Sequence, residues 1–347
     1  MNGTLRWATM TTMQTPAVYP TVAAMLAEAT DRIAVHSSDG KSGSTFERLR
    51  IGGERYFLKS LSHDEDWIMR VTGDVDHRPL LSWRAGLYHQ TPDCIDHTIV
   101  AMAVEGSGTS ARLSMLMHDI GEYLIPEGDD VVALDVHESF IDHMAAMHAH
   151  FWGWSDTVGL SPLPHRFRFF APANIAAELR RPDVSPVITV ADQGWRILAD
   201  RAPKLAAIAA SIHEDPQPLA QALSTTPSTF VAGDWKMGNL GRHADGRTIL
   251  LDWAYPGEAP GAWDLAWYLA LNRARLPQSK EATIVVYRDA LERRGVDTSE
   301  WFDRQMALSL LGMAACFAWE KAHGDDDELF WWQDRAEYAM GQLTGEP

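Results

Sequence analysis

The chain contains 347 residues, which is long enough for one large domain or for two lobes with a substantial core. Its net charge of −17 argues against a nucleic-acid surface, since neutralising phosphates requires a basic face. The sequence has only two cysteines, Cys94 and Cys316, and no apolar run approaches the roughly 20 residues of a membrane-spanning helix. Its amino-terminal residues lack the apolar core of a signal peptide. We therefore expect a globular, cytoplasmic protein with no nucleic-acid and no membrane partner.

The amino-terminal third is typical of a short helix followed by a sheet. Apolar residues at helical spacing predict a helix over 19–30. Short apolar runs, separated by a Ser/Gly-rich turn and a Gly-Gly turn, predict three strands over 32–61, the last two forming a tight hairpin. The mixed segment 64–92 is expected to contain helix, and two further strands are predicted to follow it. Residues 32–117 are therefore expected to form a mainly antiparallel sheet.

Beyond Ile120 the pattern becomes helical. Amphipathic spacing predicts a helix over 135–152 and another over 193–214, which Pro203 must break or restart. Residues 263–345 are expected to form three helices, because they are rich in Ala, Leu, Trp and Met.

These elements predict an α+β, two-lobed organisation. A small antiparallel-sheet lobe is expected over residues 1–117, and a large, mainly helical lobe over residues 118–347. The boundary is predicted within residues 117–121.

Four polar side chains stand among apolar neighbours late in the sequence: Asp234, Asn239, Asp252 and Asp264. An Asp-Gly pair between "NLGR" and "TILLDW" predicts a hairpin that begins next to Asn239 and ends at Asp252. If the register pairs those ends, an amide oxygen lies beside a carboxylate. Mg²⁺ prefers such oxygens, with phosphate oxygens and water completing its octahedron. Asp234, five residues before Asn239, can face the same cavity as a base without binding the metal.

The motifs "AGDWKMGN", "ILLDW" and "DLAW" resemble those of the phosphotransferase family with the kinase-like fold, which includes aminoglycoside phosphotransferases and choline kinases. The family pattern is H-G-D-x-x-x-x-N, a hairpin, an apolar run ending in I/L-D-W/F, and D-L-A. The resemblance implies ATP and Mg²⁺ as cofactors. It implies that Asp234 is the catalytic base, that Asn239 and Asp252 are metal ligands, and that Asp264 supports the catalytic loop.

A weaker resemblance covers the first lobe. The strand "RYFLKSL" is similar to the one that carries the nucleotide-binding lysine, so Lys59 is expected to contact the α- and β-phosphates. The segment 37–45, with Ser42, occupies the place of the loop that covers the phosphates. The strand "LSMLMHDI" is similar to the one that enters the hinge, so adenine is expected to bond backbone groups near His118 and Ile120.

The sequence departs from the family pattern at three places, one of which is the carboxy-terminal substrate region, including "AHGDDDELFWW", which matches no substrate class. Ala232 stands where the family has histidine. The acidic partner of the lysine is not evident, and four residues remain candidates: Glu65, Asp66, Asp74 and Asp76. The main hypothesis is a small-molecule kinase, and the alternative is a pseudokinase-like binding protein. The alternative is supported only by Ala232 and by the imperfect phosphate loop.

Histidines lie close together on the predicted helix 135–152, at His143, His148 and His150. They lack the H-E-x-x-H pattern and the acidic ligands of a zinc site, so we interpret them as partly buried helix residues.

The phosphate acceptor is predicted to be a hydroxylated small molecule such as a sugar, an amino sugar or an aminoglycoside-like compound. The carboxylates of Glu320 and of residues 325–328 lie near Trp319, Trp331 and Trp332, and such a set attracts a cationic ligand. The alternative is that the acids face solvent and that the tryptophans belong to the core.

Overall fold

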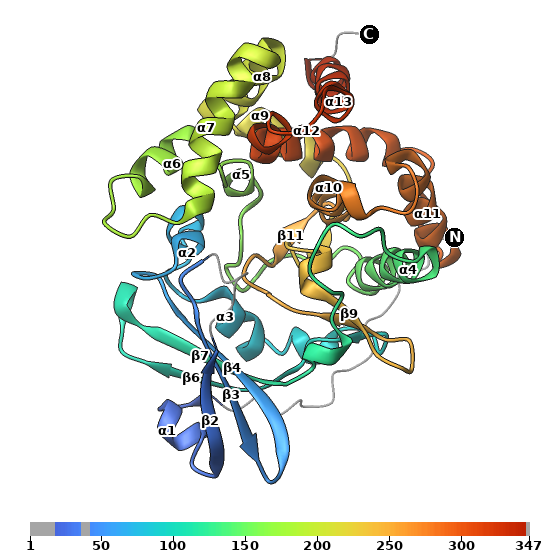
Figure 1. Ribbon diagram of the computed structural model, residues 1–347. Coiled ribbons are helices and arrows are strands. Elements are labelled where there is room, and N and C mark those ends of the chain that lie inside the picture. The colour runs from blue at the N-terminus through green and yellow to red at the C-terminus, as the bar shows by residue number, and fades with distance from the viewer. Residues whose placement is uncertain (1–17, 36–41, 345–347) are drawn as a thin grey trace.

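The computed structural model describes residues 18–35 and 42–344. In this part of the chain the amino-terminal residues form a six-stranded sheet, and the helices gather at the other end of the molecule (Figure 1). Neighbouring strands are antiparallel, except that the two-residue β1 pairs parallel with β6. In spatial order the strands are β1 (Val18–Tyr19), β6 (Ile99–Glu105), β7 (Arg112–His118), β4 (Glu54–Ser62), β3 (Thr45–Ile51) and β2 (Ala29–Val35). The predicted antiparallel sheet is confirmed.

The predicted helix over 19–30 is wrong for most of its length. Helix α1 (Val22–Met25) contains four residues and is capped by the Thr21 side chain. From Ala29 onward the chain is already in β2, where Ala29 pairs with Ile51 of β3. Pairing with a neighbouring strand therefore overrides the helical spacing of the alanines.

The hairpin between β3 and β4 determines where Lys59 points. Gly52 and Gly53 both have positive φ, at 60° and 90°, as a two-residue hairpin turn requires. The register places Lys59 opposite Phe46 of β3 and opposite Met115 of β7. Directly paired residues share a face, so these three side chains point to the same side of the sheet.

The two faces of the sheet pack differently. One face covers a small cluster with α1, formed by Met25, Leu26, Leu49, Leu58, Ala103 and Leu116. On the other face, Leu61 and Met115 belong to the large core that continues through the helical part. Lys59 is on this second face, so its side chain is directed toward the helices.

Segment 64–92 contains helix, as predicted, in the form of two short helices after β4: α2 (Trp67–Thr72) and α3 (Arg78–Arg84). Helix α2 also joins the sheet to the helical part. Its Trp67 ring lies 5.7 Å from Phe169 and 5.4 Å from Phe170, and Arg70 forms a two-pronged ion pair with Glu178 at 2.8 and 2.6 Å.

The remaining helices form the larger part of the molecule. They are α4 (Leu134–His150), α5 (Leu163–Arg166), α6 (Pro172–Glu178), α7 (Pro186–Arg201), α8 (Pro203–Glu214), α9 (Gln217–Ser224), α10 (Ala262–Leu271), α11 (Lys280–Arg293), α12 (Phe302–Lys321) and α13 (Asp326–Thr344). Pro203 restarts the chain as α8, as expected. In the described part of the carboxy-terminal region, four helices replace the predicted three, because Pro277, Gly295 and Gly324 interrupt it three times.

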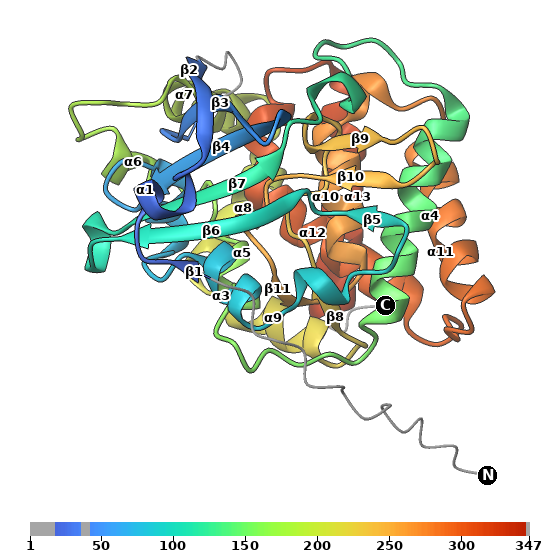
Figure 2. The ribbon, with the colours of Figure 1, turned by 90° about the horizontal axis from the view of Figure 1, so that it is seen from below.

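Short strands support the loops of the candidate site. β8 (Thr229–Val231) pairs with β11 (Gly257–Ala259). β9 (Leu240–Arg242) and β10 (Thr248–Leu250) form the predicted hairpin, and β5 (Ile95–Asp96) joins β10 in parallel. Figure 2 shows these three strands beside α4. Among the described helices, none has both the length and the apolar character needed to cross a lipid bilayer.

Candidate active site

The loop after β8 passes very close to the segment that follows β10. Gly233 has φ of 83°, and a Cβ atom at this position would lie 1.9 Å from the Tyr255 carbonyl oxygen. Only glycine fits this position, because both the backbone angle and the contact exclude a side chain. The close approach brings Asp234, the next residue, to the place where the two segments meet.

The Asp234 carboxylate is held on both oxygens. Oδ1 accepts a hydrogen bond from the Trp267 indole nitrogen at 2.7 Å. Oδ2 accepts one from Asn239 Nδ2 at 2.8 Å and forms an ion pair with Lys236 Nζ at 3.0 Å. Three donors from two segments therefore fix the direction in which this carboxylate can accept a proton.

Asp252 faces Lys59 across the two parts of the molecule. Lys59 Nζ lies 2.8 Å from Asp252 Oδ1, and the two residues are 193 positions apart. Burial of the Asp252 carboxylate raises its pKa, but the charge and hydrogen bond of Lys59, with the charge of Lys236, more than offset this, so the pKa lies below its usual range. Asp252 is therefore ionised at neutral pH.

The backbone at Asp252 is unusual, and it lies at the end of the predicted hairpin. Its φ is 56°, a left-handed conformation that costs a non-glycine residue of the order of 1 kcal/mol. The hairpin register pairs Leu240 with Leu250, and the Leu251 amide donates to the Asn239 carbonyl at 2.9 Å. The hairpin thus brings the backbones around Asn239 and Asp252 together, as the sequence predicted.

Asp264 holds the backbone of the Asp234 loop. It is fully buried in the first turn of α10, and it accepts hydrogen bonds from the amides of Ala232 and Gly233, both at 2.9 Å. His148 Nε2 lies 3.3 Å from Asp264, and His148 Nδ1 lies 2.7 Å from the Tyr287 hydroxyl. A histidine from α4 therefore contacts Asp264 beside the position where Ala232 replaces the family histidine.

Sequence reasoning missed Lys236 and Trp267, and it interpreted His148 only as a partly buried helix residue, whereas His148 is fully buried and contacts Asp264. Trp267 carried a usable signal, since it stands three residues after Asp264 and residues at this spacing share a helix face. His148 carried no such signal, because its contacts come from distant parts of the chain.

In the first lobe, the described end of the predicted phosphate loop, residues 42–45, is anchored to α2. Residues 37–41 of that loop lie outside the described residues, and Ser42 is described. The Ser42 carbonyl accepts the Trp67 amide at 3.0 Å, and its hydroxyl lies 3.2 Å from that of Ser44. Ser44 in turn donates to Asp66, at 3.3 Å. Ser42 is therefore held at the beginning of α2.

Among the described residues, none of the four candidate acidic partners forms an ion pair with Lys59, although burial raises the pKa of Asp66 and the charge of Lys59 acts against that rise. Glu65 pairs with Arg112 at 2.5 Å. Asp66 caps α2 by accepting the Met69 amide at 3.1 Å, and Asp74 accepts the Arg78 amide on both oxygens, at 2.9 and 3.1 Å. Burial raises the pKa of Asp74 to about 6. Asp76 is exposed. The ion pair of Lys59 in this structure is with Asp252.

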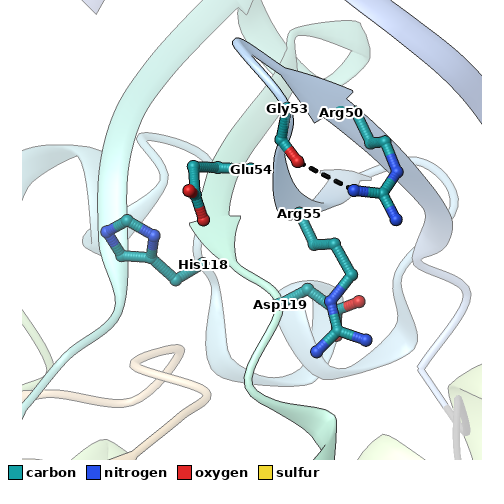
Figure 3. A pocket seen from close by; sticks show the side chains of 6 residues that line it. All are labelled: Arg50, Gly53, Glu54, Arg55, His118 and Asp119. Atoms are coloured by element: carbon teal, nitrogen blue, oxygen red, sulfur yellow. Dashed lines mark hydrogen bonds between the residues drawn. The ribbon is translucent and has the colours of Figure 1, made fainter.

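The turn after β7, where the resemblance places the adenine-binding hinge, is polar. A pocket of about 450 Å³ lies beside it (Figure 3), lined by Arg50, Gly53, Glu54, Arg55, His118 and Asp119. The His118 amide donates to the Thr98 carbonyl at 3.0 Å, so it is not available to adenine. The His118 ring stacks on Tyr56 at 5.3 Å, on the face of the sheet opposite Lys59. Ile120 is buried, and its carbonyl accepts the Tyr123 amide at 2.9 Å.

The carboxy-terminal acids are largely matched by the protein's own cations. Asp325 pairs with Arg273, Asp326 with Arg201, and Glu320 with Lys321, at 2.5–2.6 Å. Glu328 is buried between Lys280 and Arg273 and accepts the Trp332 indole hydrogen bond.

The nearby tryptophans are also occupied. Trp319 and Trp332 are buried, and Lys280 lies over the Trp331 ring at 4.7 Å. The expectation that these acids and tryptophans form a pocket for a cation is therefore not supported. The alternative is confirmed for most of these residues, because Glu320 and residues 325–327 are exposed and Trp319 and Trp332 are buried; Glu328, which is buried, is the exception among these acids.

Small-molecule kinases are among the solved structures that this chain resembles. A microcompartment-associated aminopropanol kinase matches with a TM-score of 0.50 and 13% identity, covering 91% of this chain and 93% of that one. The 347-residue chain therefore has the kinase-like phosphotransferase fold. A choline kinase from Streptococcus pneumoniae matches with a TM-score of 0.47 and 11% identity, covering 93% of this chain and 96% of that one. An aminoglycoside phosphotransferase from Streptomyces rimosus matches with a TM-score of 0.47 and 19% identity, covering 80% and 94%.

No protein-family model matches the sequence, and no curated protein matches it. At 13% identity the first of these structures establishes the fold alone.

Proposed function

We propose that the protein is an ATP-dependent kinase that transfers the γ-phosphate of ATP to a hydroxyl group of a small molecule. One observation carries this proposal: Lys59 from the sheet meets Asp252 from the helical part at 2.8 Å, beside the loop that bears Asp234 and Asn239. In the kinase-like fold a cation, two oxygen ligands and a base at the junction of the lobes serve phosphoryl transfer. The two lobes that we propose to meet at this junction are residues 1–117 and residues 118–347.

The residues present fit Mg²⁺ as the metal. Asn239 donates its amide nitrogen to Asp234, so its Oδ1 is directed away from that carboxylate. Asp252 is ionised and uses Oδ1 for Lys59, which leaves Oδ2 for a cation. Amide and carboxylate oxygens are the ligands that Mg²⁺ prefers. We assign Asn239 and Asp252 as its ligands, and the bound ion supplies positive charge to the phosphate oxygens.

Side chains of the protein carry out the other parts of the reaction. Lys59 binds the phosphates of ATP, and Asp234 orients the acceptor hydroxyl and takes its proton. The hydroxyl oxygen forms a new bond to the γ-phosphorus, the bond from that phosphorus to the β,γ-bridging oxygen breaks, and ADP leaves. Lys236, 3.0 Å from Asp234, adds positive charge next to the reacting oxygens.

The adenine is assigned to the apolar end of the same sheet face. Phe46 and Phe57 are half-buried rings 5.6 Å apart, and the register places both on the Lys59 face, as it does Met117. Apolar side chains over a flat base stabilise it by burial and stacking. The His118 amide and the Ile120 carbonyl both form internal hydrogen bonds, so the hinge contact is assigned to the remaining backbone groups around Ile120. Ser42 is assigned to the loop over the phosphates.

The acceptor is a hydroxylated small molecule of the sugar, amino sugar or aminoglycoside kind. An aspartate base suits an alcohol, whose proton must be removed. The paired carboxy-terminal acids lend no support to a requirement for positive charge on the acceptor. The pseudokinase alternative loses its main support, because Asp264 and His148 hold the loop in which Ala232 replaces histidine.

Mg²⁺-dependent binding of ATP is the first test of this assignment. A ligand present at 100 times its Kd stabilises the folded protein by about 2.7 kcal/mol, so thermal unfolding should move upward with Mg²⁺-ATP concentration. Asp252→Asn keeps the size and the tolerance for left-handed backbone, and it should abolish the Mg²⁺-dependent part of the shift. Asp245→Asn is the matched control, because that exposed carboxylate lies on the same hairpin and pairs with its neighbour Arg247. A Mg²⁺-dependent shift that persists in Asp252→Asn would overturn the metal assignment.

A further inference from the structure

We propose that Trp267 is the positioning residue for the catalytic base: its indole N–H holds the Asp234 carboxylate in the orientation from which it takes the acceptor's proton. This inference rests on the proposed kinase function and adds a residue that the family motif does not assign. The inference rests on the hydrogen bond of 2.7 Å that Trp267 Nε1 donates to Asp234 Oδ1.

The indole is held rigidly by its surroundings. Trp267 is 3% exposed. Its ring lies 5.0 Å from Phe317 in an edge-to-face contact, 5.8 Å from Phe169, 6.2 Å from Tyr255 and 6.5 Å from Trp263. Aromatic rings packed on several sides leave the side chain one rotamer, so the N–H cannot turn away from Asp234.

One helix therefore holds both the backbone and the side chain of the catalytic loop. In α10, Asp264 accepts the amide of Gly233, and Trp267, three residues later, donates to the carboxylate of Asp234. The loop and its reactive group are fixed to one rigid element, which is how a base is kept in productive geometry.

The chemistry of the donor suits this role. An indole N–H donates and does not accept, so Trp267 cannot compete with Asp234 for the acceptor's proton. The second oxygen already receives Asn239 Nδ2 and Lys236 Nζ. Because Oδ1 also accepts a hydrogen bond, the carboxylate cannot rotate. Its lone pairs therefore have fixed directions, and the acceptor hydroxyl must approach along one of them.

The test compares two tryptophan-to-phenylalanine changes on the same helix. Trp267→Phe keeps an aromatic ring and removes the donor to Asp234. Trp263→Phe is the matched control: its buried indole nitrogen has no hydrogen-bond partner in the described structure, and phenylalanine keeps an aromatic ring on the side of Trp267 that Trp263 covers, so this variant tests a change of packing without loss of a donor to Asp234. We expect Trp267→Phe to lower kcat about 10-fold or more with an unchanged KM for ATP, and Trp263→Phe to leave both near wild type. Equal kcat values for Trp267→Phe and wild type overturn the inference while the kinase assignment stands.

A spectroscopic arm needs no acceptor and separates this inference from the proposed function. The sequence contains 14 tryptophans, whose indole N–H signals can be resolved by labelling with ¹⁵N. Trp267→Phe identifies the Trp267 signal. Removing its acceptor by Asp234→Ala should move that signal more than the signal of Trp263 and toward the range of weakly bonded indoles. If the Trp267 signal is unmoved, the contact is absent and the inference is wrong, whether or not the protein transfers phosphate.

Discussion

Replacing Asp234 by asparagine is expected to lower turnover by about 10²-fold or more while ATP still binds. The change keeps the size of the side chain and removes its ability to take a proton. The introduced amide can still accept the Trp267 indole hydrogen bond through its oxygen. Its nitrogen must then face Asn239 and Lys236, which are both donors, so some local rearrangement is also expected.

The measurement is kcat together with the affinity for Mg²⁺-ATP from the thermal shift. Asp245→Asn again serves as a control, since it makes the same chemical change on the exposed hairpin turn. Turnover within a few-fold of wild type in Asp234→Asn would rule out its role as the base. Loss of ATP binding in this variant would instead place Asp234 among the groups that hold the nucleotide.

The largest effect on stability is expected at Asp264. In Asp264→Ala, two buried backbone amides and His148 lose their acceptor at once. Each unsatisfied buried donor costs about 1–3 kcal/mol, so the free energy of unfolding should fall by about 3–5 kcal/mol. Chemical denaturation followed by tryptophan fluorescence measures this change.

A second acid at a helix start provides the comparison for Asp264. Asp303 lies in the first turn of α12, is 84% exposed and pairs with Arg288 at 3.3 Å. Asp303→Ala should cost no more than about 1 kcal/mol, because exposed ion pairs and helix-end charges contribute little. If the free energy of unfolding falls by a similar amount in both variants, the hydrogen bonds from the loop to Asp264 do not make the large contribution to stability that we expect.

The parts of the fold that sequence alone predicts are those governed by local patterns. The β3–β4 hairpin follows from two glycines at a turn, and the β9–β10 hairpin from an Asp-Gly pair. The start of α8 follows from Pro203. Helix α1 was overextended because the alanines before β2 suit a helix locally, whereas pairing with β3 decides their conformation.

The site shows the same division between local and distant contacts. Asp234 and Asn239 are five residues apart, so one motif predicts both. Lys59 and Asp252 are 193 positions apart in the sequence, so neither local motif predicts the direct contact between their side chains. The pairing of Asp326 with Arg201 and of Glu328 with Lys280 likewise comes from other helices. The acidic run suggested a cation pocket, whereas residues 325–327 are exposed at the surface and Glu328 is buried against cations of the protein itself.

The most direct measurement is phosphoryl transfer itself. The protein, Mg²⁺ and ATP are incubated with a panel of hydroxylated compounds in which each amino sugar is paired with its neutral parent. Mass spectrometry then follows ADP and the phosphorylated acceptor together. The account predicts that wild type forms the two products in equal amounts with at least one compound, and that Asp234→Asn does not. ADP formed without a phosphorylated acceptor, ATP left intact across the panel, or equal product from Asp234→Asn would contradict it.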